Sequence, residues 1–188
     1  MTGLGDKELC EALRKGGESR ELAFAELYRR YASRIYQYAR RILNQDMEAE
    51  DILQETFIKF LAILEKGAEI ENVPAYLLRI ARNLSFRSES KKQVTVPIED
   101  YHAIFNEVPM EAEETSKVLQ MSLDLLPKEQ REALVLQVYG GLSYNEIAEV
   151  MGVPMTTVRN WIVRAKDKMR KIVAPYFHGN GEEETRDY

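Results

Sequence analysis

The sequence predicts an all-α protein of two small helical domains joined by a flexible acidic linker, the C-terminal domain being a helix-turn-helix. Apolar residues recur at the three-to-four spacing of buried helical stripes, and no stretch shows convincing alternation of period two. Residues 94–110 contain two prolines and no clear period, which is more typical of a domain boundary than of a compact domain. We therefore expect an N-terminal domain over 1–93, a linker over 94–110, a C-terminal domain over 111–178 and an acidic tail over 179–188.

Three amphipathic helices are expected in the N-terminal domain. The apolar stripe of the first consists of Phe24, Leu27, Tyr28, Tyr31, Ile35, Tyr38, Ala39 and Ile42. Asp46 is suited to cap the second helix, which Gly67 ends. The stripe of this second helix consists of Ala49, Ile52, Leu53, Thr56, Phe57, Phe60, Leu61 and Leu64. Pro74 opens the third helix at its first turn, where proline is tolerated. The third stripe consists of Leu77, Leu78, Ala81 and Leu84.

Two further helices are expected at the start of the C-terminal domain. The first runs from near Glu111 to about Leu125. The second begins at Pro127 and ends at the pair Gly140–Gly141, because glycine is a common stop signal at the C-terminus of a helix.

The segment 142–173 has the spacing of a helix-turn-helix. Ser143 and Glu146 form the pattern of a capping box, in which the serine accepts from the third amide and the glutamate reaches back. Gly152 is suited to a left-handed turn, and Pro154 separates the short helix from a longer one over 155–172. The residues expected to face inward are Ile147, Ala148, Val158, Ile162 and Ala165. Many helical pairs that do not bind DNA share a glycine turn, so the spacing alone leaves the function open.

The net charge of −5 and the pI near 5.3 argue at first against a nucleic-acid-binding protein. The distribution of charge weakens this objection. The net charge is +1 over 1–93, −5 over 94–121, +2 over 122–178 and −3 over 179–188. The acidity therefore lies mainly in the linker and the tail.

Two helical segments carry a basic surplus, +5 over 155–172 and +4 over 74–92. Polar side chains at the start of a recognition helix reach base edges, and later basic groups hold phosphates. A solvated basic face is the alternative interpretation, and it suits the residues Lys168 to Lys171 better than Arg159 or Asn160. A further basic set consists of Arg29, Arg30, Arg34, Arg40 and Arg41, for which a solvated helix face is at least as good an interpretation.

Other features exclude several classes of protein. The single cysteine Cys10 excludes an intramolecular disulfide framework and a multi-cysteine zinc site, and the histidines His102 and His178 do not suggest a metal cluster. We expect no cofactor, no metal and no catalytic residues, since no nucleophile elbow or phosphate loop is present. The sequence has no apolar run long enough for a membrane span and no signal-peptide pattern, so we expect a cytoplasmic protein without membrane insertion.

Two segments together resemble one family. PKEQREALVLQVYGGLSYNEIAEVMGVPMTTVRNWIVRAKDKMRKI is similar to the C-terminal promoter-binding domain of bacterial RNA polymerase sigma factors. AEDILQETFIKF, followed by PAYLLRIARNLSFRSESKK, is similar to their core-binding and promoter-melting domain. The order and size match the small extracytoplasmic-function (group four) sigma factors, over roughly residues 20–173. The resemblance implies a non-enzymatic role in transcription initiation.

The resemblance also implies three sets of site residues. Those implied to bind the polymerase are Asp51, Gln54, Glu55 and Lys59. Those implied to melt and hold the minus-ten element are Tyr76, Arg79, Arg82, Asn83, Phe86 and Arg87, although Tyr76 and Phe86 suit a buried core equally well. Those implied to read the minus-35 element are Thr156, Thr157, Arg159, Asn160, Val163, Arg164 and Lys166. Trp161 departs from the basic residue common in the family, and either packs against the first helix of the motif or contacts a phosphate or partner.

The implied partners are core RNA polymerase, promoter DNA and a sequestering anti-sigma factor, with the chain a monomer when free. Two rival functions remain open from the residues alone. One is a free-standing helix-turn-helix regulator that binds duplex DNA as a dimer, and the other is a protein-interaction module that only sequesters a partner.

Overall fold

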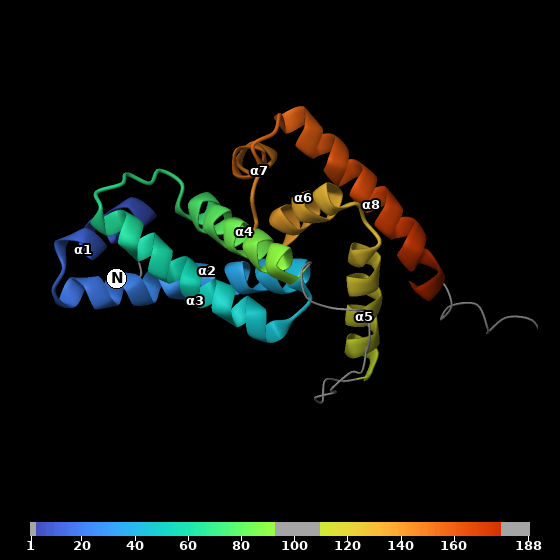
Figure 1. Cartoon of the computed structure of the whole chain (residues 1–188), viewed down its shortest axis with the longest axis horizontal. Coiled ribbons are helices and arrows are strands. Elements are labelled where there is room, and N and C mark those ends of the chain that lie inside the picture. The colour runs from blue at the N-terminus through green and yellow to red at the C-terminus, as the bar shows by residue number, and fades with distance from the viewer. Residues whose placement is uncertain (1–2, 93–109, 178–188) are drawn as a thin grey trace, which may run out of the picture.

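A computed structural model describes residues 3–92 and 110–177 (Figure 1). Within these residues the chain forms helices and no strand, which confirms the all-α fold class. The helices are α1 (Asp6–Lys15), α2 (Glu18–Leu43), α3 (Asp46–Glu65), α4 (Val73–Lys92), α5 (Met110–Asp124), α6 (Lys128–Val138), α7 (Tyr144–Met151) and α8 (Met155–Phe177). The expected linker and tail lie almost entirely outside the described residues. None of the helices described could span a membrane.

Helix α2 is the central helix of the N-terminal half, which comprises residues 3–92. Helices α1, α3 and α4 all pack against it (Figure 1). The three expected stripes are largely buried, because residues three and four apart share one face of a helix. Tyr28 is the main exception. Its side chain is partly exposed, and its ring lies across the edge of the core, with its centroid 4.9 Å from that of Phe57.

The start of this half differs from the sequence prediction. Helix α1 was not predicted, and α2 begins six residues before Phe24. Gly16 and Gly17, with φ of 76° and 72°, separate the two helices. Asp46 does not cap α3 but is its first helical residue, where it accepts from Arg40 Nε at 2.6 Å. Gln45 is the cap residue and makes no side-chain capping bond.

The C-terminal half contains the expected helix-turn-helix in α7 and α8. Glu146 N donates to Ser143 Oγ at 3.4 Å, and Ser143 N donates to Glu146 Oε2 at 2.7 Å, so the capping box is formed. The side-chain and backbone hydrogen bonds from Ser143 hold the pKa of Glu146 below its ordinary value. Gly152 adopts the left-handed conformation, φ 70° and ψ 37°, that suits a residue without a Cβ.

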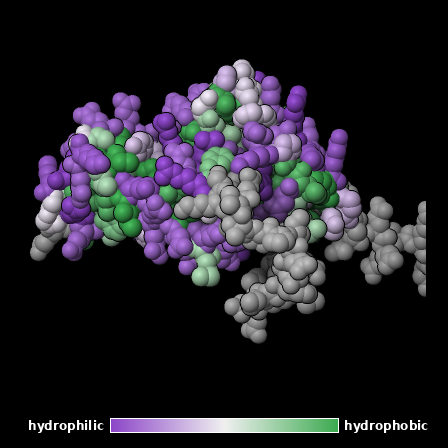
Figure 2. All heavy atoms as spheres, in the orientation of Figure 1, coloured by the Kyte–Doolittle hydropathy of each residue, from purple (hydrophilic) through white to green (hydrophobic). Residues whose placement is uncertain are grey.

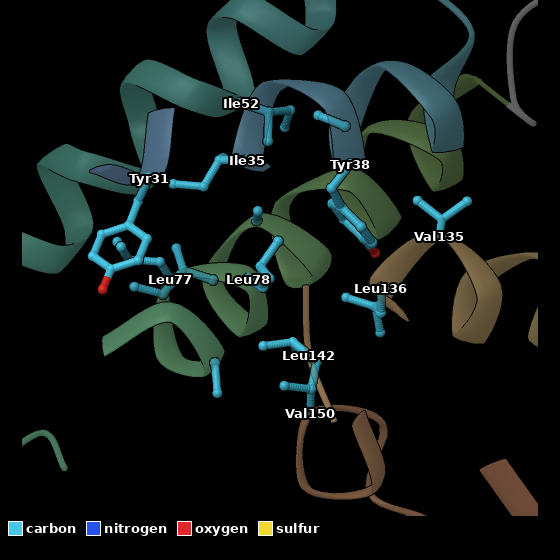
Figure 3. Packing of buried hydrophobic residues seen from close by; sticks show 14 of the residues in the cluster. Tyr31, Ile35, Tyr38, Ile52, Leu77, Leu78, Val135, Leu136, Leu142 and Val150 are labelled. Carbon is cyan, nitrogen blue, oxygen red and sulfur yellow. The ribbon is translucent and has the colours of Figure 1, made fainter. Parts of the chain in front are cut away.

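The two halves are in contact, and their buried residues form one continuous apolar core. Helix α4 packs against α7, and α2 packs against α6. Figure 3 shows Leu77 and Leu78 of α4 on the same side as Leu136 of α6, with Leu142 and Val150 close by. The face of the molecule seen in Figure 2 is largely hydrophilic, with separate apolar patches.

The arginines of α2 form intramolecular contacts. Glu26 is 7% exposed and accepts from Arg29 Nη2 at 2.8 Å and from Arg30 Nε at 2.7 Å. Arg30 also pairs with Asp6 of α1 at 2.9 Å. The hydrogen bonds from Arg29 and Arg30 lower the pKa of Glu26 from 4.5 to about 2. Arg30 therefore joins α1 to α2, whereas Arg29 pairs within α2.

The depressed pKa of Glu26 predicts a specific pH dependence. The stabilisation by its carboxylate is fully present above about pH 4.5 and is lost as the pH falls toward about 2. We expect Glu26→Gln to lower the urea midpoint at pH 7 and to differ much less from the wild type at pH 3. A midpoint difference that does not shrink at acid pH would contradict this role of the ion pairs.

Candidate nucleic-acid interface

A groove of about 630 Å³, here called the basic groove, lies between α3 and α4. Its polar lining consists of Lys59, Lys66, Tyr76, Arg79, Asn83 and Arg87. Its apolar lining consists of Ala62, Ile63, Ile80 and Leu84. Four cations, one aromatic ring and one amide therefore open onto a single surface channel. We regard this channel as the candidate site for single-stranded nucleic acid, for which basic groups and stacking rings are the usual combination.

The helical repeat of α4 positions the groove side chains. Tyr76, Arg79, Asn83 and Arg87 follow one another at intervals of three and four residues, so they share one face. The opposite face carries the buried stripe that fixes the rotation of the helix. The start of α4 is fixed as well, because Ala75 N donates to the Asn72 side chain at 3.0 Å.

Two of the six residues implied for the minus-ten element lie outside the basic groove. Arg82 Nε donates to Glu132 Oε1 of α6 at 2.6 Å. The Phe86 ring lies under two cations, with Arg82 Cζ at 4.7 Å and Lys128 Nζ at 4.2 Å from its centroid. Tyr76 is half-buried at the groove and Phe86 is half-buried at the contact between the two halves, so neither is a fully buried core residue.

Helix α8 presents a second, separate surface, here called the recognition surface. A shallow hollow of about 470 Å³ is lined by Thr156, Arg159, Asn160, Val163 and Arg164. The face opposite it is buried through Val158, Ile162 and Ala165. The structure thus brings together five of the seven residues implied for the minus-35 element. Thr157 is half-buried and Lys166 is exposed, and neither lines the hollow.

Pro154 and Trp161, which the sequence analysis singled out, make local contacts at α8. The carbonyl of Pro154 accepts hydrogen bonds from Thr157 N at 2.9 Å and from Val158 N at 3.2 Å. The proline, which has no N–H to donate, therefore contributes the acceptor of the first hydrogen bonds of α8. Trp161 is half-buried and packs against the core. Farther along, Lys168 Nζ donates to the Leu125 carbonyl at 2.6 Å.

The outer face of α3 carries the residues implied to bind the polymerase. Asp51, Gln54 and Glu55 are exposed, whereas Lys59 turns toward the basic groove and pairs with Glu55 at 3.2 Å. Ile58 was missed by the sequence analysis, although it is 65% exposed on this face. Ile58 could have been found from the sequence, because it is an apolar residue that lies outside the apolar stripe of its helix.

Comparison with known proteins finds two matching family models. Sigma-70 region 2 matches residues 27–93, and Sigma-70, region 4 matches residues 116–169. The chain is 31% identical over 190 residues to the RNA polymerase sigma-H factor of Pseudomonas aeruginosa, covering 93% of this chain and 97% of that protein. It is 30% identical over 180 residues to the ECF RNA polymerase sigma factor SigW of Bacillus subtilis, covering 88% of this chain and 95% of that protein. With the ECF RNA polymerase sigma factor SigE of Mycolicibacterium smegmatis it shares 31% identity over 170 residues, or 86% of this chain and 65% of the relative.

Two solved structures share the fold. The structure of CnrH in complex with the cytosolic domain of CnrY superposes with a TM-score of 0.70, at 23% identity, over 90% of this chain and 97% of that one. The sigma factor RpoE of Bartonella quintana, solved with the anti-sigma factor NepR, gives a TM-score of 0.63 at 24% identity, over 80% of this chain and 96% of that one.

Proposed function

Because the chain belongs to the extracytoplasmic-function family of RNA polymerase sigma factors, we propose that it binds core RNA polymerase and directs promoter-specific transcription initiation. Members of this family are transcription initiation factors rather than enzymes. The observation that carries the proposal is the pair of separate grooves, one basic with an aromatic ring and an amide, the other on a recognition helix. They suit two different DNA substrates, a single strand and a duplex.

The N-terminal domain is proposed to melt the minus-ten element in the basic groove. Unpairing costs a few kcal/mol for each flipped base, and contacts in a pocket offset this cost. Tyr76 supplies a ring for stacking and Asn83 an amide for a base edge, while Arg79 and Arg87 supply charge for the backbone. Arg82 and Phe86 would extend this surface when α6 does not cover them.

The C-terminal domain is proposed to read the minus-35 element as duplex. An arginine side chain recognises guanine, and an asparagine side chain recognises adenine, through two hydrogen bonds each. Arg159 and Asn160 lie at the exposed start of α8. Thr156, Thr157, Val163 and Arg164 would complete the base contacts. Lys166, farther along, is placed to hold a phosphate.

The exposed face of α3 is proposed as the polymerase-binding surface. Asp51, Gln54 and Glu55 suit pairing with a charged helical partner, and Ile58 adds an apolar centre to that face. The chain would act in the cytoplasm as a monomer until it meets the polymerase. Because the similar sigma factor RpoE of Bartonella quintana was solved with the anti-sigma factor NepR, we also propose control by an anti-sigma factor. A pull-down that yields only polymerase would count against that control.

Arg159→Ala is expected to weaken binding to a minus-35 duplex by about 1–3 kcal/mol, because one bidentate base contact is lost. The measurement is an affinity titration of the holoenzyme on matched promoters that differ in this element. Arg170→Ala is the control, since this side chain is 75% exposed on the same helix and is bonded to Asp167. Unchanged promoter preference in the Arg159 variant would remove its role in base reading.

A gel-shift with and without core polymerase tests the function as a whole. The free chain should bind promoter DNA poorly, since each domain offers few phosphate contacts, and binding should become tight with core enzyme. Tight and specific binding by the free chain, together with a dimeric mass in light scattering, would favour the free-standing regulator instead.

A further inference from the structure

The loop over residues 66–72, here called the α3–α4 loop, joins the two helices that form the basic groove. Its acidic residues Glu69 and Glu71 are exposed and line a second hollow, of about 350 Å³. Tyr76 and Arg79 line both this hollow and the basic groove. The loop therefore forms a wall beside the ring and the cation that are proposed to hold the melted strand.

Both ends of the α3–α4 loop are fixed by the local sequence. Gly67, with φ of 86°, ends α3, and its N–H donates to the Leu64 carbonyl at 3.0 Å. The Asn72 side chain accepts from Ala75 N at the start of α4. Between these ends, Ile70 is 9% exposed and anchors the loop in the core. The position of the acidic side chains then depends on the backbone on either side of Ile70.

Helix α1 supplies a hold on that backbone. Arg14, in the last turn of α1, donates from Nη2 to the Ala68 carbonyl. This carbonyl belongs to the peptide group that joins Ala68 to Glu69. The guanidinium carries a full charge, so the bond is stronger than a bond between neutral groups. Arg14 thus fixes the peptide immediately before the first acidic residue of the loop.

Helix α1 is itself firmly placed, which makes it a suitable support. Its residues Leu9 and Leu13 are buried, and its Asp6 pairs with Arg30 of α2 at 2.9 Å. Figure 1 shows α1 next to the end of α3 from which the loop leaves, and the two helices are in contact. The match to Sigma-70 region 2 begins at residue 27, so Arg14 lies outside the matched residues.

We propose that Arg14 is a positioning residue for the minus-ten step, because its bond to the Ala68 carbonyl holds Glu69 and Glu71 beside a base stacked on Tyr76. The proposal rests on the proposed function and adds a residue of α1 to it. Carboxylates accept hydrogen bonds from exocyclic amino groups, which adenine, cytosine and guanine carry and thymine lacks. The positioned loop would therefore disfavour thymine at the base that it faces.

Arg14→Ala tests the proposal in the holoenzyme, formed from the full-length chain and core polymerase. The templates are promoters randomised at both elements, and sequencing of the transcribed templates gives the base preference at each position. We expect the preference for amino-bearing bases over thymine at one minus-ten position to fall about threefold to tenfold, since a charge-assisted bond to the loop is lost. The preference at the minus-35 element should not change, because α8 lies in the other half.

Three other variants make the result specific. Lys15→Ala removes the same charge from the neighbouring exposed position and should keep the wild-type preference. Arg14→Lys keeps the charge and a donor and should recover most of the preference. Arg14→Met keeps the length of the side chain without a donor, and it replaces Arg14→Ala if that variant does not fold, as judged by circular dichroism.

An unchanged minus-ten preference in the folded variants that lack the donor would overturn the positioning role. An equal loss in Lys15→Ala, or an equal loss at both promoter elements, would also overturn it, since charge or general stability would then explain the effect. Wild-type selection of thymine at every minus-ten position would contradict the part assigned to the carboxylates.

Failure of the proposed function gives a different result. Wild-type chain mixed with core polymerase would then produce no promoter-specific transcript, and the positioning role would fall with the function. A wild-type holoenzyme that initiates with a defined minus-ten preference, which Arg14→Ala retains in full, would refute the positioning role alone.

Discussion

Arg79→Glu is expected to reduce promoter opening by the holoenzyme by roughly a hundredfold, because it removes a charge-assisted contact and adds repulsion of the DNA strand. Arg79 is exposed, and it lines the basic groove together with Lys59, Lys66 and Arg87. A carboxylate at this position would place a like charge beside the DNA backbone. Permanganate reactivity of unpaired thymines measures the opening directly.

The matched control is Lys7→Glu. It makes the same charge reversal at an exposed position of α1, outside the basic groove. Both variants should co-elute with core polymerase, since neither touches the outer face of α3. If the Arg79 variant opens promoters as well as the Lys7 variant does, the basic groove does not hold the melted strand.

Phe60→Ala is expected to lower the free energy of unfolding by about 3–5 kcal/mol, through lost burial and the cavity that remains. Phe60 is 0% exposed in α3, the helix that carries both the proposed polymerase surface and one wall of the basic groove. A loss of this size is a large share of the stability of an ordinary domain. Equilibrium unfolding in urea measures it.

Ile58→Ala is the control for this measurement. The residue lies two positions away in the same helix but is exposed, so its truncation should change the unfolding free energy by less than about 0.5 kcal/mol. The same variant should weaken binding to core polymerase if the outer face of α3 is the docking surface. Equal stability losses at the two positions would contradict the assigned orientation of α3.

The helices that were predictable from the sequence are those whose packing follows a local pattern. The stripe from Leu77 to Leu84 is buried as expected, because a run of apolar residues at helical spacing specifies one inward face. The capping box at Ser143 and the left-handed Gly152 were likewise predictable, since their geometry depends on residues within one turn.

Helix α1 was not predictable in the same way. It is short, and its apolar side consists of Leu9, Cys10 and Leu13. Its position depends on long-range contacts, in which Arg14 donates to the Ala68 carbonyl and Asp6 accepts from Arg30. Such partners lie too far along the chain to appear in any local pattern.

The candidate site likewise has a part that was predictable from local spacing and a part that was not. Residues that share one face of α4 could be grouped from spacing and from the family resemblance. The separation of Arg82 and Phe86 from the basic groove could not be foreseen, because it depends on Glu132, 50 residues after Arg82 and in the other half. Sequence spacing reports which residues share a helix face, whereas contacts between the two halves require their placement.

Run-off transcription with core RNA polymerase tests the central claim most directly. The templates are a promoter library randomised at both elements, transcribed with and without this chain. We expect the chain to add transcripts that start at defined positions and to select a common sequence pair at the minus-35 and minus-ten spacing. Transcript profiles that are identical with and without the chain would contradict its assignment as a promoter-directing subunit.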